Sequence, residues 1–87
     1  MNLRSDTAAF QRSIQLDLAL EFVRERRAQL SSAIGREEAK AHPDMVAVEV
    51  FREEMLELPN LLDLGELDDA ALELEIQRLK EIAHAGR

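Results

Sequence analysis

The sequence predicts an all-α protein: a small antiparallel bundle of about three helices, with one long N-terminal helix packed against two shorter ones. Apolar side chains recur at steps of three and four residues, which places them on one face of an α-helix. Aromatic residues are only 3% of the chain, so the core depends on Leu, Ile, Val, Met and Ala, which favours helices over a sandwich or barrel. With 87 residues the chain lacks the apolar area for a second core, and we expect residues 1–87 to form a single helical domain that dimerisation completes.

The first helix is expected to begin at a cap formed by Ser5 or Asp6, whose short side chains accept hydrogen bonds from unpaired backbone N–H groups. A coiled-coil-like seam with one polar member follows; it consists of Leu16, Leu20, Val23, Arg27, Leu30 and Ile34. Gly35 can end or bend this helix, whereas the REEAKA sequence has the propensity to extend it. Residues 35–42 are therefore compatible with either helix or loop.

His42 and Pro43 mark the clearest boundary, because a residue before proline is pushed out of the α region and proline suits the first position of a helix. Asp44 then lies where the helix dipole favours an anion. The apolar stripe of this second helix consists of Met45, Val48, Phe51, Met55 and Leu58, with Leu56 at its edge.

The third helix is predicted from the sequence LDDAALELEIQRLKEIA. Asp68 is the expected N-cap, and Leu67 is placed to pack on Leu72 as a hydrophobic staple. The seam of this helix consists of Leu72, Ile76, Leu79 and Ala83, and Gly86 is expected to end it.

The connection LPNLLDLGELDD, residues 58–69, is rich in both leucine and acid. Pro59 cannot extend the second helix, and Gly65 permits a left-handed turn. We interpret four leucines as a plug that closes one end of the bundle: Leu58, Leu61, Leu62 and Leu64. The alternative is a docking peptide that another protein binds. LLDLG resembles the leucine-rich acidic box that binds clathrin, although Gly65 stands where that motif has an acid.

A second apolar face distinguishes the first half of the long helix. On a helical wheel, Phe10, Ile14, Leu18 and Phe22 lie on the side opposite the seam. Two short helices can cover one face, so we expect the second to form a homodimer or partner interface; a bent third helix or the N-terminal residues are the alternative cover. Arg27 is also a candidate interface residue, because a polar side chain in a seam can set the register of a dimer. The alternative is that its stem lies along the seam with its charge in water.

The charge balance bears on the partners. The chain has 18 acidic and 11 basic residues, a net charge of −7, which repels phosphate backbones and argues against nucleic-acid binding. Acidic side chains crowd the C-terminal half, where they would steer a protein partner with a basic surface. No apolar run reaches the ~20 residues of a membrane span and no signal peptide is visible, so we expect a cytoplasmic protein that does not enter a membrane.

No motif predicts catalysis, a metal or a cofactor. The serines have no nearby His–acid constellation, there is no glycine-rich phosphate loop, and the chain has no cysteine, so we expect no enzyme. Glu81 and His84 have the i, i+3 spacing by which ferritin-like bundles bind metal, but we interpret this pair as a solvated helix end.

The leading hypothesis is a non-enzymatic protein–protein interaction module of the regulator, inhibitor or chaperone type, which self-associates and presents acidic helices to a basic protein partner. In size and charge the chain resembles small acidic helical proteins of bacteria, phages and plasmids, such as antitoxins, secretion chaperones, immunity proteins and inhibitors. The alternatives are a structural subunit of a larger assembly, a ferritin-like metal-binding protein, and a DNA-binding regulator.

Overall fold

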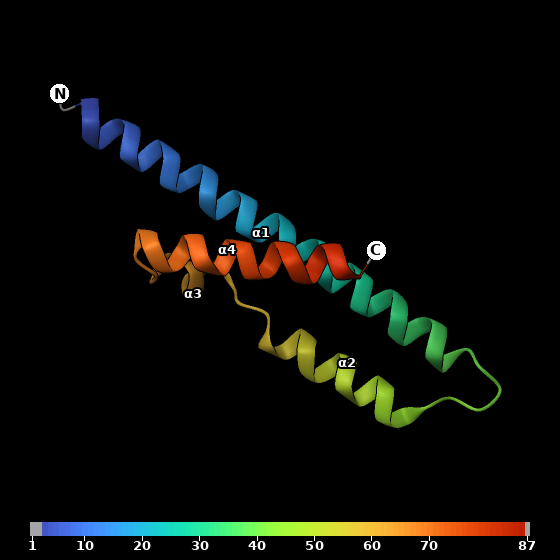
Figure 1. Ribbon diagram of the computed structural model, residues 1–87. Helices are drawn as coiled ribbons and strands as arrows, with labels where there is room; N and C mark the ends of the chain where they lie inside the picture. The colour runs from blue at the N-terminus through green and yellow to red at the C-terminus, as the bar shows by residue number, and fades with distance from the viewer. Residues whose placement is uncertain (1–2, 87) are drawn as a thin grey trace.

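The computed structural model describes residues 3–86, with side chains from residue 7 onward, and this part of the chain is helical without a strand (Figure 1). It contains four helices: α1 (Leu3–Glu38), α2 (Met45–Glu57), α3 (Leu61–Gly65) and α4 (Asp69–Ala85). The predicted all-α fold, with one long N-terminal helix and shorter helices packed on it, is confirmed. The five-residue helix α3 was not predicted.

Helix α1 is the spine of the molecule, and the three other helices pack on it. Helix α2 runs antiparallel to α1 and α4 runs parallel to it, which gives an up–down–up order along the chain (Figure 1). Contacts confirm both directions: Arg12 and Gln29 of α1 reach the beginning and the end of α4, whereas Glu37 reaches the cap of α2 and Arg26 reaches Glu54 near the end of α2. Because α4 and α2 are displaced along the spine, the molecule is elongated, with extents of 63 × 20 × 16 Å.

The core lies where α4 and α3 meet the middle of α1. Its buried members are Ala19, Val23, Leu64, Leu72, Ile76 and Leu79. The predicted α4 seam is confirmed, since all four of its residues are buried. On α1 the buried line passes through Ala19, a small residue that allows α4 to approach closely. Helix α2 contributes one buried residue, Val48, and its predicted first stripe residue, Met45, is 55% exposed.

The connection between α1 and α2 differs from the prediction. Helix α1 begins at Leu3, before the expected cap at Ser5 or Asp6, and continues through Gly35 to Glu38, which settles residues 35–38 as helix. Pro43 precedes α2 instead of opening it. Asp44 is the N-cap, because its carboxylate accepts hydrogen bonds from the N–H groups of Val46 and Ala47 at 3.0 and 3.1 Å.

Glu37 ties this connection together. Its carboxylate accepts hydrogen bonds from Lys40 Nζ at 2.7 Å and from the Asp44 N–H at 2.8 Å. Both favour the ionised form and lower the pKa of the Glu37 carboxyl below its ordinary value of 4.5. The last turn of α1 is thus joined to the cap of α2 by a single carboxylate.

Residues 58–69 contain two caps and the short helix between them. Asn60 and Asp63 form a capping box at the start of α3, with hydrogen bonds of 2.9 and 3.1 Å. The predicted cap of α4 is confirmed, since Asp68 accepts from the Ala71 N–H at 2.7 Å. The predicted left-handed turn at Gly65 is wrong: this residue ends α3 with a negative φ, because Glu66 continues the right-handed turn.

Candidate interaction surfaces

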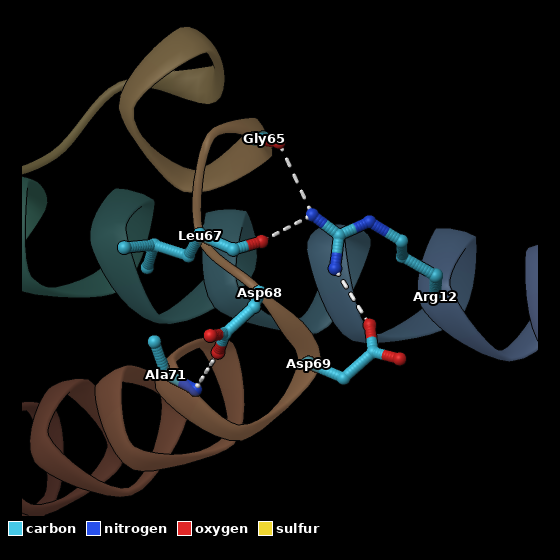
Figure 2. Close-up of polar contacts among 6 residues, drawn as sticks. All are labelled: Arg12, Gly65, Leu67, Asp68, Asp69 and Ala71. Carbon is cyan, nitrogen blue, oxygen red and sulfur yellow. Dashed lines mark hydrogen bonds and ion pairs between the residues drawn. The ribbon is translucent and has the colours of Figure 1, made fainter.

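Arg12 clamps the junction between α3 and α4 to the spine. Figure 2 shows its guanidinium group between the end of α3 and the first residue of α4. Nη2 donates to the carbonyl oxygens of Leu67 at 2.5 Å and Gly65 at 3.1 Å, and Nη1 donates to Asp69 Oδ1 at 2.8 Å. A cation at the carbonyl end of α3 also interacts favourably with the negative end of the helix dipole. Arg12 is therefore a structural residue, and its side chain is not available for a partner.

A second polar cluster joins α1 to both α2 and the end of α4. Arg26 donates to Glu54 through Nε at 2.5 Å and through Nη2 at 3.0 Å, and this bidentate pair raises the pKa of the Arg26 guanidinium. Gln29 accepts from Arg26 Nη1 at 3.2 Å and donates to the Ala83 carbonyl oxygen at 2.8 Å. These contacts fix the helices on the spine, and no sequence motif predicted them.

The predicted second apolar face is exposed over most of its length. We define the outer face of α1 as Phe10, Ile14 and Leu18, whose exposed fractions are 66%, 50% and 39%. Residues 7–11 are all exposed, and this end of α1 extends beyond the start of α4 (Figure 1). Within the described part of the chain, neither alternative cover applies, because α4 packs on the opposite side and the N-terminal residues continue α1 as a helix.

Phe22 does not belong to this outer face, which corrects the prediction. It packs against the core and meets the ring of His84 edge-on, with ring centroids 6.1 Å apart. Side chains four residues apart drift by about 40° around a helix of 3.6 residues per turn, so the row that begins at Phe10 has turned toward α4 by Phe22.

Arg27 is exposed and is not buried in the seam, which agrees with the alternative that its charge lies in water. The inward-facing arginine is its neighbour Arg26, because the buried face of α1 is centred on the Ala19–Val23–Leu30 line. Arg27 is exposed and lines a shallow hollow of about 460 Å³ between α1 and α2. We define the basic hollow as Arg27, Arg52, Met55 and Leu56.

The plug hypothesis for the leucines of residues 58–69 is confirmed in part. Leu64 is completely buried in the core and Leu58 packs against it. Leu61 and Leu62 point away, with exposed fractions of 56% and 77%. Helix α3 has one inward face, and Leu62, two residues before Leu64, lies on the other side of the helix. Leu61 and Leu62 are therefore surface residues that the plug does not explain.

The candidate metal pair stays apart from any third ligand. The described residues hold no group of three or more His, Cys, Asp or Glu side chains placed to bind one metal ion. His84 of the Glu81–His84 pair lies instead against Phe22.

No helix in the described part of the chain is long and apolar enough to cross a membrane.

In comparisons with known proteins, no family model, no curated protein and no solved structure matches this chain.

Proposed function

We propose that the protein is a small helical interaction module that self-associates through the outer face of α1 and presents acidic helices to a basic protein partner. The observation that carries this proposal is the exposure of Phe10 and Ile14, by 66% and 50%, on the first half of α1. Large apolar side chains grouped on one face, away from the core, are typical of an interaction surface.

The backbone of this segment supports the same interpretation. Residues 7–11 are helical although they are all exposed, and an isolated helix of a few turns is only marginally stable in water. A second α1 packed on Phe10, Ile14 and Leu18 would bury their side chains and stabilise the helix in the same step. The small size of the protein points in this direction too, because a chain of 87 residues buries little apolar surface by itself.

The acidic residues support the second half of the proposal. Four of the C-terminal carboxylates are paired with arginines within the chain: Glu49 with Arg52, Glu54 with Arg26, Asp69 with Arg12 and Glu75 with Arg78. Others are exposed on α2, α3, α4 and the turns between them: Glu53, Glu57, Asp63, Glu66, Asp68 and Glu73. Such a surface attracts a basic protein and raises its association rate at low salt.

Light scattering on the purified full chain tests self-association. We expect a concentration-dependent rise in mass above the monomer, and Phe10→Ser weakens it by about tenfold or more, because burial of a large apolar side chain contributes about 1.5–3 kcal/mol. Leu74→Ser is the matched control, since Leu74 is a similarly exposed apolar residue, 73% exposed, on α4. If the wild-type chain is monomeric at every concentration, or if both variants behave like wild type, the outer face is not a self-association surface.

A screen for partners tests the acidic surface. The structural-subunit alternative predicts that the outer face binds a different chain. The binding of a partner captured from the host should therefore be measured with Phe10→Ser and with a variant in which Glu49, Glu53 and Glu57 are replaced by Gln. Loss of capture by the Gln variant alone supports binding through the acidic helices, and loss by Phe10→Ser alone supports the subunit alternative.

A further inference from the structure

Two surfaces that belong neither to the core nor to the outer face of α1 have opposite properties. The first is the basic hollow, in which two guanidinium groups flank two apolar side chains. Its volume of about 460 Å³ lies within the range of ~300–1,000 Å³ of ligand-sized sites. Leu56 on its floor is 86% exposed.

The arginines of the basic hollow keep hydrogen-bonding capacity. Arg27 has no hydrogen bond or ion pair within the described part of the chain, unlike its neighbour Arg26. Arg52 forms ion pairs with Glu38 at 3.7 Å and with Glu49 at 3.8 Å; both distances are longer than a hydrogen bond, and its side chain is half exposed. Arg27 is therefore the guanidinium of the hollow that has no counter-charge in the described part of the chain, and it lies beside an apolar floor.

The second surface is the tip of α3, which we define as Leu61, Leu62, Asp63 and Glu66. Its two leucines are exposed, and its two acids are exposed beside them. Asp63 accepts one hydrogen bond from the Asn60 N–H, and a carboxylate can accept several. The α3 tip therefore offers what the basic hollow lacks: apolar side chains for its floor and carboxylates for its arginines.

We propose that the α3 tip of a second copy of this chain docks in the basic hollow. Leu62 packs on Met55 and Leu56, and the acids of the tip face Arg27 and Arg52. The argument for a second copy is charge and apolar complementarity, because one chain carries both halves of the contact. Two copies can exchange it reciprocally, with each chain supplying one tip and one hollow around a two-fold axis.

This contact uses residues separate from the outer face of α1 and stands independently of the proposed function. If both contacts form, the chain assembles beyond a dimer, since each copy then has two different self-complementary surfaces. If only one forms, the assembly stops at two copies. The two proposals can therefore succeed or fail separately.

A complementation experiment tests the tip–hollow contact in the full chain. The background is Phe10→Ser, which removes the outer-face contact. Leu62→Asp is added to one sample to disable the tip, and Arg27→Glu is added to another to disable the hollow. Both positions are exposed, and circular dichroism on each variant checks that the helices remain.

Sedimentation is then measured for each sample alone and for an equimolar mixture. We expect the Phe10→Ser chain to dimerise, and each added substitution to weaken dimerisation by about tenfold or more. Leu62→Asp removes a buried leucine, which contributes at least that factor, and Arg27→Glu places a carboxylate opposite the acids of the tip. The mixture regains part of the association, since in one of its two reciprocal contacts the intact tip of one chain meets the intact hollow of the other. A Phe10→Ser chain that is already monomeric, or a mixture that associates no better than its components, overturns the proposal. Leu74→Asp in the same background is the control for a charge placed on an exposed leucine.

Discussion

The two leucines Leu62 and Leu64 allow the structural role of α3 to be measured within a single helical turn. Leu64 is completely buried, whereas Leu62 is 77% exposed. Leu64→Ala removes buried carbons and leaves a cavity where α3 meets the spine, so we expect the free energy of unfolding to fall by about 2–5 kcal/mol. Leu62→Ala deletes atoms that are mostly in water already, and we expect a change within about 0.5 kcal/mol. The total free energy of unfolding of a domain of this size is roughly 4–13 kcal/mol, so Leu64→Ala removes a large part of the stability.

Urea denaturation followed by far-ultraviolet circular dichroism measures both values. The protein concentration must be low enough for the chain to be monomeric, because Leu62 also belongs to the proposed tip–hollow contact and self-association would add to its apparent effect. Equal losses for the two variants, or a larger loss for Leu62→Ala, would refute the placement of Leu64 in the core and with it the role of α3 as the plug.

Two further predictions concern the polar ties between the helices. For the Arg26–Glu54 pair, a double-mutant cycle with Arg26→Met and Glu54→Gln should give a coupling energy of about 1 kcal/mol in urea denaturation. The coupling energy is modest because Glu54 is partly solvated. A coupling energy of zero would mean that the bidentate contact does not hold α2 on the spine. For Glu37, whose pKa is lowered in the folded chain, the stabilisation is complete above the ordinary value of 4.5 and is lost as the pH falls through the lowered pKa. Glu37→Gln should therefore be less stable than wild type at neutral pH and should converge with it in acid, and a difference that is constant with pH would contradict this account.

The elements with strong periodicity were predictable from the sequence. The α4 seam has large apolar residues at uninterrupted three- and four-residue steps, and Asp68 supplies a cap immediately before them, so both the face and the start of the helix were fixed locally. The length of α1 was harder to predict, because Gly35 carries no signal that separates a helix end from a helix interior.

The errors in the candidate sites share one physical cause. The buried face of α1 is determined by where α4 and α2 lie, and several neighbouring lines on a helix satisfy the same apolar spacing. The sequence pattern placed Arg27 in the seam and Phe22 outside it, and the structure reverses both because the line through Ala19 faces α4. A small residue such as Ala19 gives little hydrophobic signal, although it decides how closely two helices approach.

The polar clamps could not be predicted, because Arg12 and Arg26 contact residues more than twenty positions away along the chain. Nothing in the local sequence distinguishes them from Arg24 or Arg27. The burial of Leu64 against the exposure of Leu62 is a similar case, since only the docking of α3 on the spine selects which leucine turns inward.

Amide hydrogen exchange along the first half of α1, measured as a function of protein concentration, tests the central claim most directly. If a second copy covers the outer face, the amides around Phe10 and Ile14 become protected as the concentration rises, and in Phe10→Ser they exchange quickly at every concentration. Protection around Val23 and Leu30, inside the core, should already be present at the lowest concentration. The account is contradicted if exchange around Phe10 and Ile14 in the wild-type chain is the same at all concentrations.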